Sequence, residues 1–433
     1  MLGKKIKMPT RLNFLNLVNS ENLERNIQIF SEMSISAHGV TRLAFTELER
    51  QSHNHFAVHM KGLGLHVWTD SAGNTMAQYP AKCENTLPFL ATGSHLDSVP
   101  EGGSYDGIVG VAAAMEIARI LSEGNISLNR PWRFIVFAAE EGARFGQACN
   151  GSRAIAGLTT SAELENLLDS SGISLAEAMR KLGFNPTIIE ESRWRHGECA
   201  AFIELHIEQG NVLESENFNI GIVNVISGSQ RLLVTVKGIA AHSGGTPMSL
   251  RKDALLTAAN GIVAIDGYAR KIENAGVRVT VGRITALPGS ITTIPGWVQF
   301  TVDIRDFEIA RQVVVVEELS KILTQMGEAN GTEVFIKPIG STPPTLLSPL
   351  VTEKLKALSS SLGLEAAILP SGASHDCQQM TRVTEAGLIF ITSKSGHSHM
   401  PEEFSSLEDI EMGVKLLFAS LFELDCTVSL SNA

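Results

Sequence analysis

The 433-residue sequence lacks the features that mark membrane, exported and nucleic-acid-binding proteins. No run approaches the roughly 18 uninterrupted apolar residues of a membrane span, and the basic N-terminal stretch leads into no apolar signal segment. Basic residues are outnumbered 35 to 46 by acidic ones, for a formal net charge of -11, and no Lys/Arg-rich run stands out. We therefore expect neither a membrane nor a nucleic acid as a partner.

Cysteines are few and scattered, and several enzyme signatures are missing. The five cysteines form no C-x-x-C pair, which argues against a disulfide framework or a thiolate zinc site and favours a reducing, cytoplasmic setting. They are Cys83, Cys149, Cys199, Cys377 and Cys426. The motifs G-x-S-x-G, G-x-x-x-x-G-K-[ST], H-E-x-x-H and G-x-G-x-x-G are absent, so the chemistries that depend on them have no support.

What the chain does contain is an ordinary globular composition, with 44% hydrophobic and 19% charged residues. Its length favours two domains over one. In the first half, short apolar runs alternate with helical patterns, which is typical of parallel strands covered by helices. We predict buried strands at 87–92, 133–139, 200–205 and 388–392, and a buried helix at 106–121 that makes a βαβ unit with the first two.

A different pattern begins near Gly221. Strands are predicted at 231–237, 277–286, 297–305 and 333–337, with helices at 249–271 and 309–326, in the order of a ferredoxin-like α+β unit. The strand at 388–392 then resumes the style of the first half. The predicted fold is therefore α/β, with a mixed, mostly parallel sheet and helices on both faces in a discontinuous catalytic domain (1–220 and 341–433). A smaller domain (221–340) is inserted into it.

Nitrogen and carboxylate side chains follow the predicted strand ends, where ligands bind in open α/β sheets. His95 and Asp106 follow the first strand, Glu140 and Glu141 the second, His206 the third and His399 the last. Such ligands suit zinc, manganese, cobalt or nickel, and a bridging carboxylate can hold two ions about 3.5–4 Å apart. A two-metal hydrolase is the natural hypothesis.

Two local patterns strengthen this hypothesis. Asp97, two residues after His95, can receive the second ring N–H and fix the tautomer, as outer partners of metal-binding histidines do. Adjacent acids are usually solvated, but Glu140 and Glu141 follow a buried strand, where acids need a cation or a proton. Because neighbouring side chains point in different directions, one Glu can hold metal while the other reaches the attacking water.

Over nearly its whole length the sequence resembles the M20 metallopeptidase-like amidohydrolases. Within them it is similar to the branch of N-carbamoyl-L-amino acid hydrolases, allantoate amidohydrolases and β-alanine synthases. The motifs that carry the resemblance are GSHLDSVPEGGSYDGIVGV, FAAEEGARFG, ELHIEQG, VKGIAAHSGGTPMSLRKDA, FTVDIRD, SGASHDCQQM and GHSHMPEE.

The resemblance implies a role for each candidate residue. Two divalent ions (Zn, Mn, Co or Ni) would be held by His95, bridging Asp106, Glu141, His206 and His399, with Glu140 as general base toward a metal-bridging water. Arg305 would clamp a substrate carboxylate, and Gln209 would hold the carbamoyl or amide end. Gly372 and Ala373 would offer backbone N–H groups. A homodimer through the smaller domain is also implied, with His242 reaching the partner's active site to steady charge on the attacked carbonyl oxygen.

Departures from the family pattern occur near the expected substrate pocket. Thr292 stands where an Asn that helps bind the carboxylate is usual. Ser374 replaces Gly, Cys377 replaces Ala, and His397 precedes the final Ser-His where an aliphatic residue is common. We expect these residues to line the pocket and to signal an unusual substrate.

The leading hypothesis is a metal-dependent amidohydrolase that cleaves the carbamoyl or ureido C–N bond of an N-carbamoyl-L-amino acid or related ureido acid. Allantoate amidohydrolase, or a dipeptidase or aminoacylase of the same superfamily, are alternatives within the same chemistry. A non-catalytic dimeric binding protein is the alternative from another class, but a chain without activity has no reason to keep all of the ligands together with Glu140.

Overall fold

The computed structural model describes residues 15–82, 87–273 and 276–426, so Cys83 and the basic N-terminal residues 1–14 lie outside the described residues. The chain divides into two compact units. Unit 1 comprises Met1–Asn224 and Leu347–Ala433, and unit 2 comprises Val225–Leu346. The predicted boundaries at 220 and 341 fall a few residues before these observed limits.

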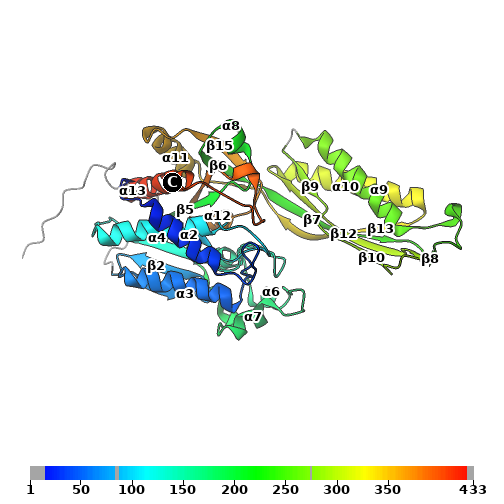
Figure 1. The fold of residues 1–433 in the computed structure, drawn as a ribbon, viewed down its shortest axis with the longest axis horizontal. Helices are drawn as coiled ribbons and strands as arrows, with labels where there is room; N and C mark the ends of the chain where they lie inside the picture. The colour runs from blue at the N-terminus through cyan, green and yellow to red at the C-terminus, as the bar shows by residue number, and fades with distance from the viewer. Residues whose placement is uncertain (1–14, 83–86, 274–275, 427–433) are drawn as a thin grey trace, which may run out of the picture. The chain divides into compact units, whose positions relative to one another are not determined.

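Unit 1 is built on a large sheet (Figure 1). Its strands are β1 (His66–Thr69), β2 (Thr75–Tyr79), β3 (Phe89–His95), β4 (Trp132–Phe137), β5 (Cys199–Ile207), β6 (Ile220–Ile226), β15 (Ala366–Ser371) and β16 (Glu385–Ile391). The order is β1-β2-β4-β3-β5-β16-β6, with β14 (Thr345–Leu346) and β15 both beside β6. The central strands β4, β3, β5 and β16 are parallel, whereas β1, β2 and β6 pair antiparallel. The predicted mixed α/β class with a parallel centre is confirmed.

Helices cover the sheet on both faces. Those that share the large apolar core with the strands are α2 (Ser20–Glu32), α3 (Glu47–Gly62), α4 (Ile108–Glu123), α11 (Pro349–Ser361) and α13 (Leu407–Cys426). A second cluster contains α5 (Asn150–Ile155), α6 (Ser161–Leu164) and α7 (Leu175–Lys181), and α12 (Asp376–Met380) packs on α5. The predicted apolar face of α4 is buried, and so is nearly every other side of that helix, because it lies at the centre of the core.

Two of the predicted strands extend further at their carboxyl ends than the sequence predicted. β3 continues to His95, and β5 continues through His206 to Ile207. Both imidazoles are almost fully buried, so they are part of the sheet edge and not of a solvent-exposed loop. Because β3, β4, β5 and β16 are parallel, their carboxyl ends meet at one edge of the sheet.

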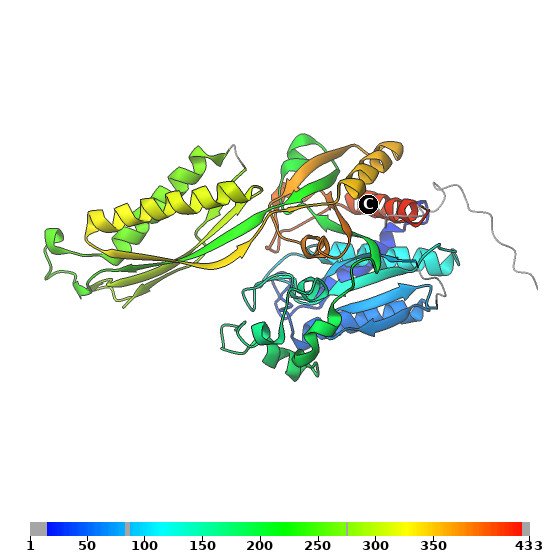
Figure 2. The same cartoon turned by 180° about the vertical axis from the view of Figure 1, so that it is seen from behind.

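Unit 2 has a sheet of order β10-β12-β7-β13, with β9 also beside β12. Figure 2 shows two helices lying along one face of this sheet. The strands are β7 (Gly228–Lys237), β9 (Arg278–Thr280), β10 (Ile284–Leu287), β12 (Trp297–Asp306) and β13 (Glu333–Thr342). Helices α9 (Ala254–Lys271) and α10 (Ile309–Asn330) pack on one face, over a core of alternating strand residues. The short strands β8 (Ala241–His242) and β11 (Thr293–Ile294) pair separately.

The single strand predicted at 277–286 is wrong, because this stretch forms the two strands β9 and β10. Thr280 lies opposite Asp303, and Ile284 lies opposite Phe300. Between these two pairs, the stretch that joins β9 to β10 therefore has one residue more than β12. Such a one-residue irregularity breaks the ladder as a bulge does, and Gly282 lies within it.

None of the described helices is long and apolar enough to cross a membrane. The cysteines of the described ranges, Cys149, Cys199, Cys377 and Cys426, form no disulfide.

Candidate active site

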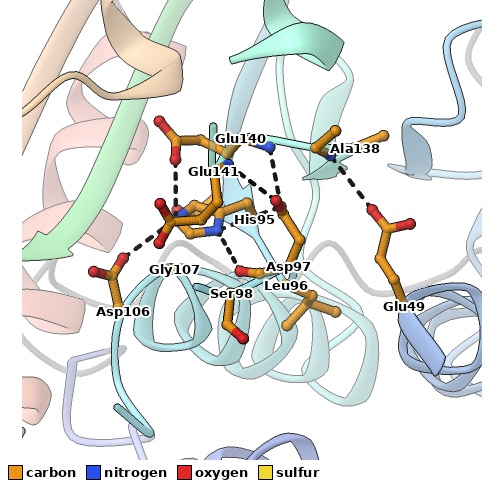
Figure 3. A network of polar contacts seen from close by, with 12 residues as sticks. Glu49, His95, Leu96, Asp97, Ser98, Asp106, Gly107, Ala138, Glu140 and Glu141 are labelled. Carbon is orange, nitrogen blue, oxygen red and sulfur yellow. Dashed lines mark hydrogen bonds and ion pairs between the residues drawn. The ribbon is translucent and has the colours of Figure 1, made fainter. Parts of the chain in front are cut away.

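His95 and His206 both direct Nε2 toward Asp106. Figure 3 shows His95 in this position. His95 Nδ1 lies 3.0 Å from the backbone carbonyl of Asp97, and His206 Nδ1 lies 2.9 Å from that of Ile207. A carbonyl can only accept, so each Nδ1 carries a proton and the neutral ring keeps its lone pair on Nε2. Both Nε2 atoms face Asp106 Oδ1, at 3.4 and 3.2 Å.

The other oxygen of Asp106 faces a second group of side chains. Asp106 Oδ2 lies 3.4 Å from His399 Nε2, which is in turn 3.3 Å from Glu141 Oε1. Asp106 therefore belongs to both sets of potential ligands, with one oxygen in each. The five residues that the sequence predicted as ligands meet at this edge of the sheet.

The spacing of these atoms fits metal ions. Ligand atoms about 2.0–2.1 Å from one tetrahedral ion lie roughly 3.3–3.4 Å apart, and the contacts around Asp106 and His399 measure 3.2 to 3.4 Å. Lone pairs of two neutral imidazoles turned toward a carboxylate oxygen would repel it without a cation between them. The donor set of imidazoles and carboxylates suits a zinc-like or manganese-like ion.

The electrostatics of the site also call for positive charge. Hydrogen bonds to Asp106 and Glu141 raise the pKa of His399 to about 11. Burial disfavours the ionised form of Asp106, but His206, His399 and His95 outweigh it and hold its pKa well below the usual range. This centre therefore stabilises a cation, whether a proton or a metal ion.

Glu140 reaches the His95 side of this centre along a different path from Glu141 (Figure 3). Its Oε2 lies 3.8 Å from His95 Nε2, and its Oε1 accepts a hydrogen bond from the thiol of Cys149 at 3.0 Å. Burial raises the pKa of Glu140 well above its ordinary value, which suits a group that takes up a proton. Cys149 was not predicted, because nothing in its local sequence distinguishes it from a core cysteine.

Asp97 contributes differently from the prediction. Its backbone carbonyl, not its carboxylate, binds His95 Nδ1, and the nearest carboxylate oxygen is 3.6 Å away. The carboxylate instead accepts the backbone N–H groups of Glu140 and Glu141, at 3.0 and 2.9 Å. The side chain of Asp97 therefore orients the Glu pair, because those two amides are its closest partners.

Glu403 is a functional candidate that the sequence did not single out. Its Oε1 accepts the backbone N–H groups of Tyr105 and Asp106, at 2.8 and 3.0 Å, and the side chain is 4% exposed. It lies in the quoted motif GHSHMPEE, but the pattern does not tell which of its two acids turns inward.

Gln209 lies next to the centre in a left-handed backbone conformation (φ 58). Its Nε2 donates to Asp106 Oδ2 at 2.7 Å, and its Oε1 is buried with no hydrogen-bond partner among the described residues. The N–H of Ala373 already donates to Ser371 Oγ at 3.2 Å. A substrate that used this N–H would have to displace that bond.

A further group of potential ligands is formed by Glu204, His206 and His375. Structural hydrogen bonds explain this group better than metal binding does. Glu204 accepts from Ser94 Oγ and from the N–H of Cys377, both at 2.8 Å. The expectation that Cys377 lines the pocket is wrong, because its side chain is fully buried and donates to the carbonyl of Gly387. Its replacement of the usual Ala concerns core packing.

Three of the predicted residues lie in unit 2. His242 is exposed, and its Nδ1 accepts the N–H groups of Gly244 and Gly245 at 3.1 and 3.0 Å, so the proton of the neutral ring is on Nε2. The carbonyl of Thr292 accepts from Ser243 N, beside the β8–β11 pair. Arg305 Nε donates to Asp303 Oδ2 at 2.9 Å on the face of β12 away from the helices.

A family-wide sequence profile described as Peptidase family M20/M25/M40 matches residues 91–423, which include every residue of the centre. The chain belongs to this family. Its recognition from the motifs is thereby confirmed.

Curated relatives within the M20 family are named as amidohydrolases or related hydrolases. N-carbamoyl-L-amino-acid amidohydrolase of Paenarthrobacter aurescens is 34% identical over 411 residues, covering 95% of this chain and 99% of the relative. The corresponding enzyme of Geobacillus stearothermophilus is 37% identical over 390 residues, covering 89% and 93%. Ureidoglycolate hydrolase of Arabidopsis thaliana is 33% identical over 434 residues, covering 98% and 91%.

Solved structures of M20-like proteins share the fold. The crystal structure of AtUAH in complex with glyoxylate has a TM-score of 0.87 at 32% identity, covering 96% of this chain and all of that one. A hydantoinase/carbamoylase-family amidase from Burkholderia vietnamiensis has a TM-score of 0.85 at 28% identity, covering 95% and 98%.

Proposed function

We propose that this protein is a metal-dependent amidohydrolase that cleaves the carbamoyl or ureido C–N bond of an N-carbamoyl-L-amino acid or a related ureido acid. The observation that carries the proposal is the orientation of Asp106, whose two oxygens each face a separate set of histidine and carboxylate ligands. This is the arrangement that two ions sharing one carboxylate require.

The ligand sets divide the residues between two ion positions. His95 and His206 would hold one ion with Asp106, and Glu141 and His399 would hold the other. Divalent ions bound there would act as Lewis acids toward the substrate carbonyl and lower the pKa of a bound water.

Glu140 is the proposed proton carrier. Its carboxylate takes the proton of the attacking water and delivers it to the nitrogen that leaves when the C–N bond breaks. Glu141 cannot share this role, since its carboxylate is turned to His399.

Substrate groups find matching partners in the remaining residues. The buried Oε1 of Gln209, which no described residue hydrogen-bonds, suits an N–H donor of the carbamoyl end. The N–H groups of Gly372 and Ala373 are further proposed contacts. The Nε2–H of His242 suits a developing oxyanion. Arg305, oriented by Asp303, suits a substrate carboxylate, with Thr292 as a neutral neighbour of His242.

The domain roles follow the same proposal. Unit 1 carries the metal ligands, and unit 2 would form the homodimer and place His242 in the partner's site. Unit 2 has several strongly exposed apolar side chains that dimerisation would cover. They include Met248, Leu250, Val263 and Ile291, at 74%, 71%, 72% and 99% exposure.

The relatives suggest two substrate classes. N-carbamoyl-L-amino acids are favoured by the 34–37% identical amidohydrolases. Ureidoglycolate is the second candidate, because a curated ureidoglycolate hydrolase aligns with 98% of this chain and the AtUAH complex is a close structural match. Both are ureido acids, so the same cleavage chemistry serves either.

The decisive experiment is a substrate panel. Metal-free protein, reloaded in turn with zinc, manganese, cobalt or nickel, is incubated with N-carbamoyl-L-amino acids, allantoate, ureidoglycolate, dipeptides and N-acyl amino acids, and ammonia or amine release is measured. We expect ammonia release from a ureido acid that depends on added metal. Turnover confined to dipeptides or N-acyl amino acids would contradict the proposal, and binding without turnover or metal would favour a binding protein.

A further inference from the structure

The backbone that carries Glu140 and Glu141 lies beyond the hydrogen-bond ladder of the sheet. The last residue of β4, Phe137, is paired with His95 of β3, and β2 pairs only as far as Val136. Ala138 and Ala139 are nevertheless fully buried. Buried amides need hydrogen-bond partners, so something other than a strand must satisfy this segment.

Three buried side chains take over where the ladder ends. Asn74 Oδ1 accepts from Ala138 N at 2.9 Å, and Glu49 Oε1 accepts from Ala139 N at 3.4 Å. Asp97 accepts the next two amides, as described above. We call the side chains of Glu49, Asn74 and Asp97 the amide clamp; Figure 3 shows Glu49 and Asp97 bonded to successive parts of the segment.

The carbonyls of the same segment are also held. Ala138 O, Ala139 O and Glu140 O accept from the N–H groups of residues 151, 150 and 149, at 2.9, 2.9 and 2.7 Å. Asn74 joins the two sides, because its Nδ2 donates to Gly151 O at 3.2 Å while its Oδ1 holds Ala138 N.

This dense bonding coincides with an unfavourable backbone conformation. Ala139 has φ 53, in the left-handed region that residues with a Cβ seldom adopt. Such conformations persist where the surroundings enforce them, and they cluster at functional sites. If the amides of 138 and 139 were released, the peptide before Glu140 could rotate and both carboxylates would move.

We propose that Asn74 and Glu49 are positioning residues for the Glu140–Glu141 pair, acting through the backbone of Ala138 and Ala139. The inference rests on the proposed function, in which Glu140 is the base and Glu141 a metal ligand. Neither residue contacts the metal ligands' side chains; each reaches the pair only through main-chain atoms. A misplacement of about 1 Å can cost roughly 100-fold in rate.

The test compares Asn74→Ala, Glu49→Ala and Glu49→Gln with the wild type. The matched control is Asp425→Ala, because Asp425 is also a buried carboxylate that accepts backbone N–H groups, from Asn129 and Arg130, before the opposite end of β4. For each metal-loaded protein, kcat and KM on the best substrate of the panel, metal content after dialysis and the thermal unfolding midpoint are measured.

We expect Asn74→Ala and Glu49→Ala to lower kcat by about 10- to 100-fold, with the smaller loss for Glu49 and its longer hydrogen bond. KM should stay within about threefold, because the substrate-gripping groups are elsewhere. Glu49→Gln keeps one carbonyl oxygen, for which Ala139 N competes with Phe45 N, the partner of Glu49 Oε2, and should recover part of the loss. Asp425→Ala should lower the unfolding midpoint and leave kcat within about twofold.

Folded, metal-loaded Asn74→Ala and Glu49→Ala proteins with wild-type kcat would overturn the inference, as would an equal loss of kcat in Asp425→Ala. Should Asn74→Ala not fold, the two Glu49 variants decide by the same criterion. Glu140→Gln, assayed in parallel, separates the two proposals. Wild-type turnover there removes the proposed base, whereas an inactive Glu140→Gln beside fully active clamp variants removes only the clamp.

Discussion

The side chains of the two neighbouring glutamates diverge within one peptide unit, and the proposed function gives them different chemistry. Glu141 reaches His399, whereas Glu140 lies between His95 and the thiol of Cys149. At the scale of single residues, the proposed metal ligand and the proposed base therefore differ in the direction of their side chains.

Glu140→Gln should leave metal content nearly unchanged and lower kcat by about 100- to 10,000-fold, because an amide cannot take up the proton of the attacking water. Glu141→Gln should instead lose bound metal. Metal analysis after dialysis and steady-state kinetics check both. The reverse pattern, with metal lost from Glu140→Gln and retained by Glu141→Gln, would exchange the two roles.

Cys149→Ala should lower kcat by roughly two- to tenfold, since it removes one hydrogen bond worth about 0.5–1.5 kcal/mol from Glu140. Cys149→Ser keeps a donor and should stay within about twofold of the wild type. Cys199→Ala is the matched control, because Cys199 is a buried thiol that donates to the carbonyl of Ala201 within β5. Equal kcat for all three variants would show that the thiol does not orient the base.

At the scale of elements, the site joins loops that are distant in the sequence. Glu403, after β16, holds the backbone of Asp106 in the loop between β3 and α4. The close approach requires glycine: a Cβ at Gly103 would lie 2.1 Å from the Glu403 carboxylate, and one at Gly107 would lie 2.6 Å from the His95 ring. Neither loop can therefore shift without moving the Asp106 carboxylate.

Glu403→Ala should weaken metal affinity by about 10- to 100-fold, as the loss of outer hydrogen bonds commonly does. Glu402→Ala is the control, because the neighbouring side chain is exposed. Competition with a fluorescent chelator measures both affinities. Indistinguishable affinities in the two variants would mean that Glu403 supports the fold and not the bridging ligand.

At the scale of the whole molecule, bound metal should stabilise one unit selectively. The proposed ligands all lie in unit 1, so metal at 100 times its dissociation constant should add about 2.7 kcal/mol to the unfolding free energy of that unit. Hydrogen exchange with and without a chelator checks this. Peptides from β3 and β5 should lose protection on chelation, while peptides from α9 should not; equal loss in both would contradict a site confined to unit 1.

Hybrid dimers test the contribution of His242 to the partner's site. Each of His242→Ala and Glu140→Gln should be inactive alone, but after subunit exchange some dimers combine an intact His242 with an intact Glu140 and regain activity. Mass spectrometry of differently tagged subunits confirms exchange. Absence of activity in exchanged dimers would place His242 at its own subunit's site or outside catalysis.

Much of the site follows from local patterns along the chain. Parallel strands bring their carboxyl ends to one edge, so the residues after LPFLAT, RFIVFAA and AAFIEL had to meet there, and His95, Asp106, Glu141 and His206 do. The strand ends themselves were misplaced by a few residues, because the polar histidines terminate an apolar pattern although their imidazoles are buried in the sheet.

The sequence by itself determined the fold class, the family and the candidate ligands, because hydrophobic periodicity and motif spacing are local properties of the chain. Only the tertiary structure decided which atoms of these residues form the contacts of the site. It assigned the Asp97 carboxylate to the Glu140 and Glu141 amides and turned Cys377 into the core. It also brought Cys149 and Glu403 to the centre, and Asn74 to the backbone of Ala138. Those contacts join residues far apart in sequence, and a hydrogen bond depends on distances that no local pattern encodes.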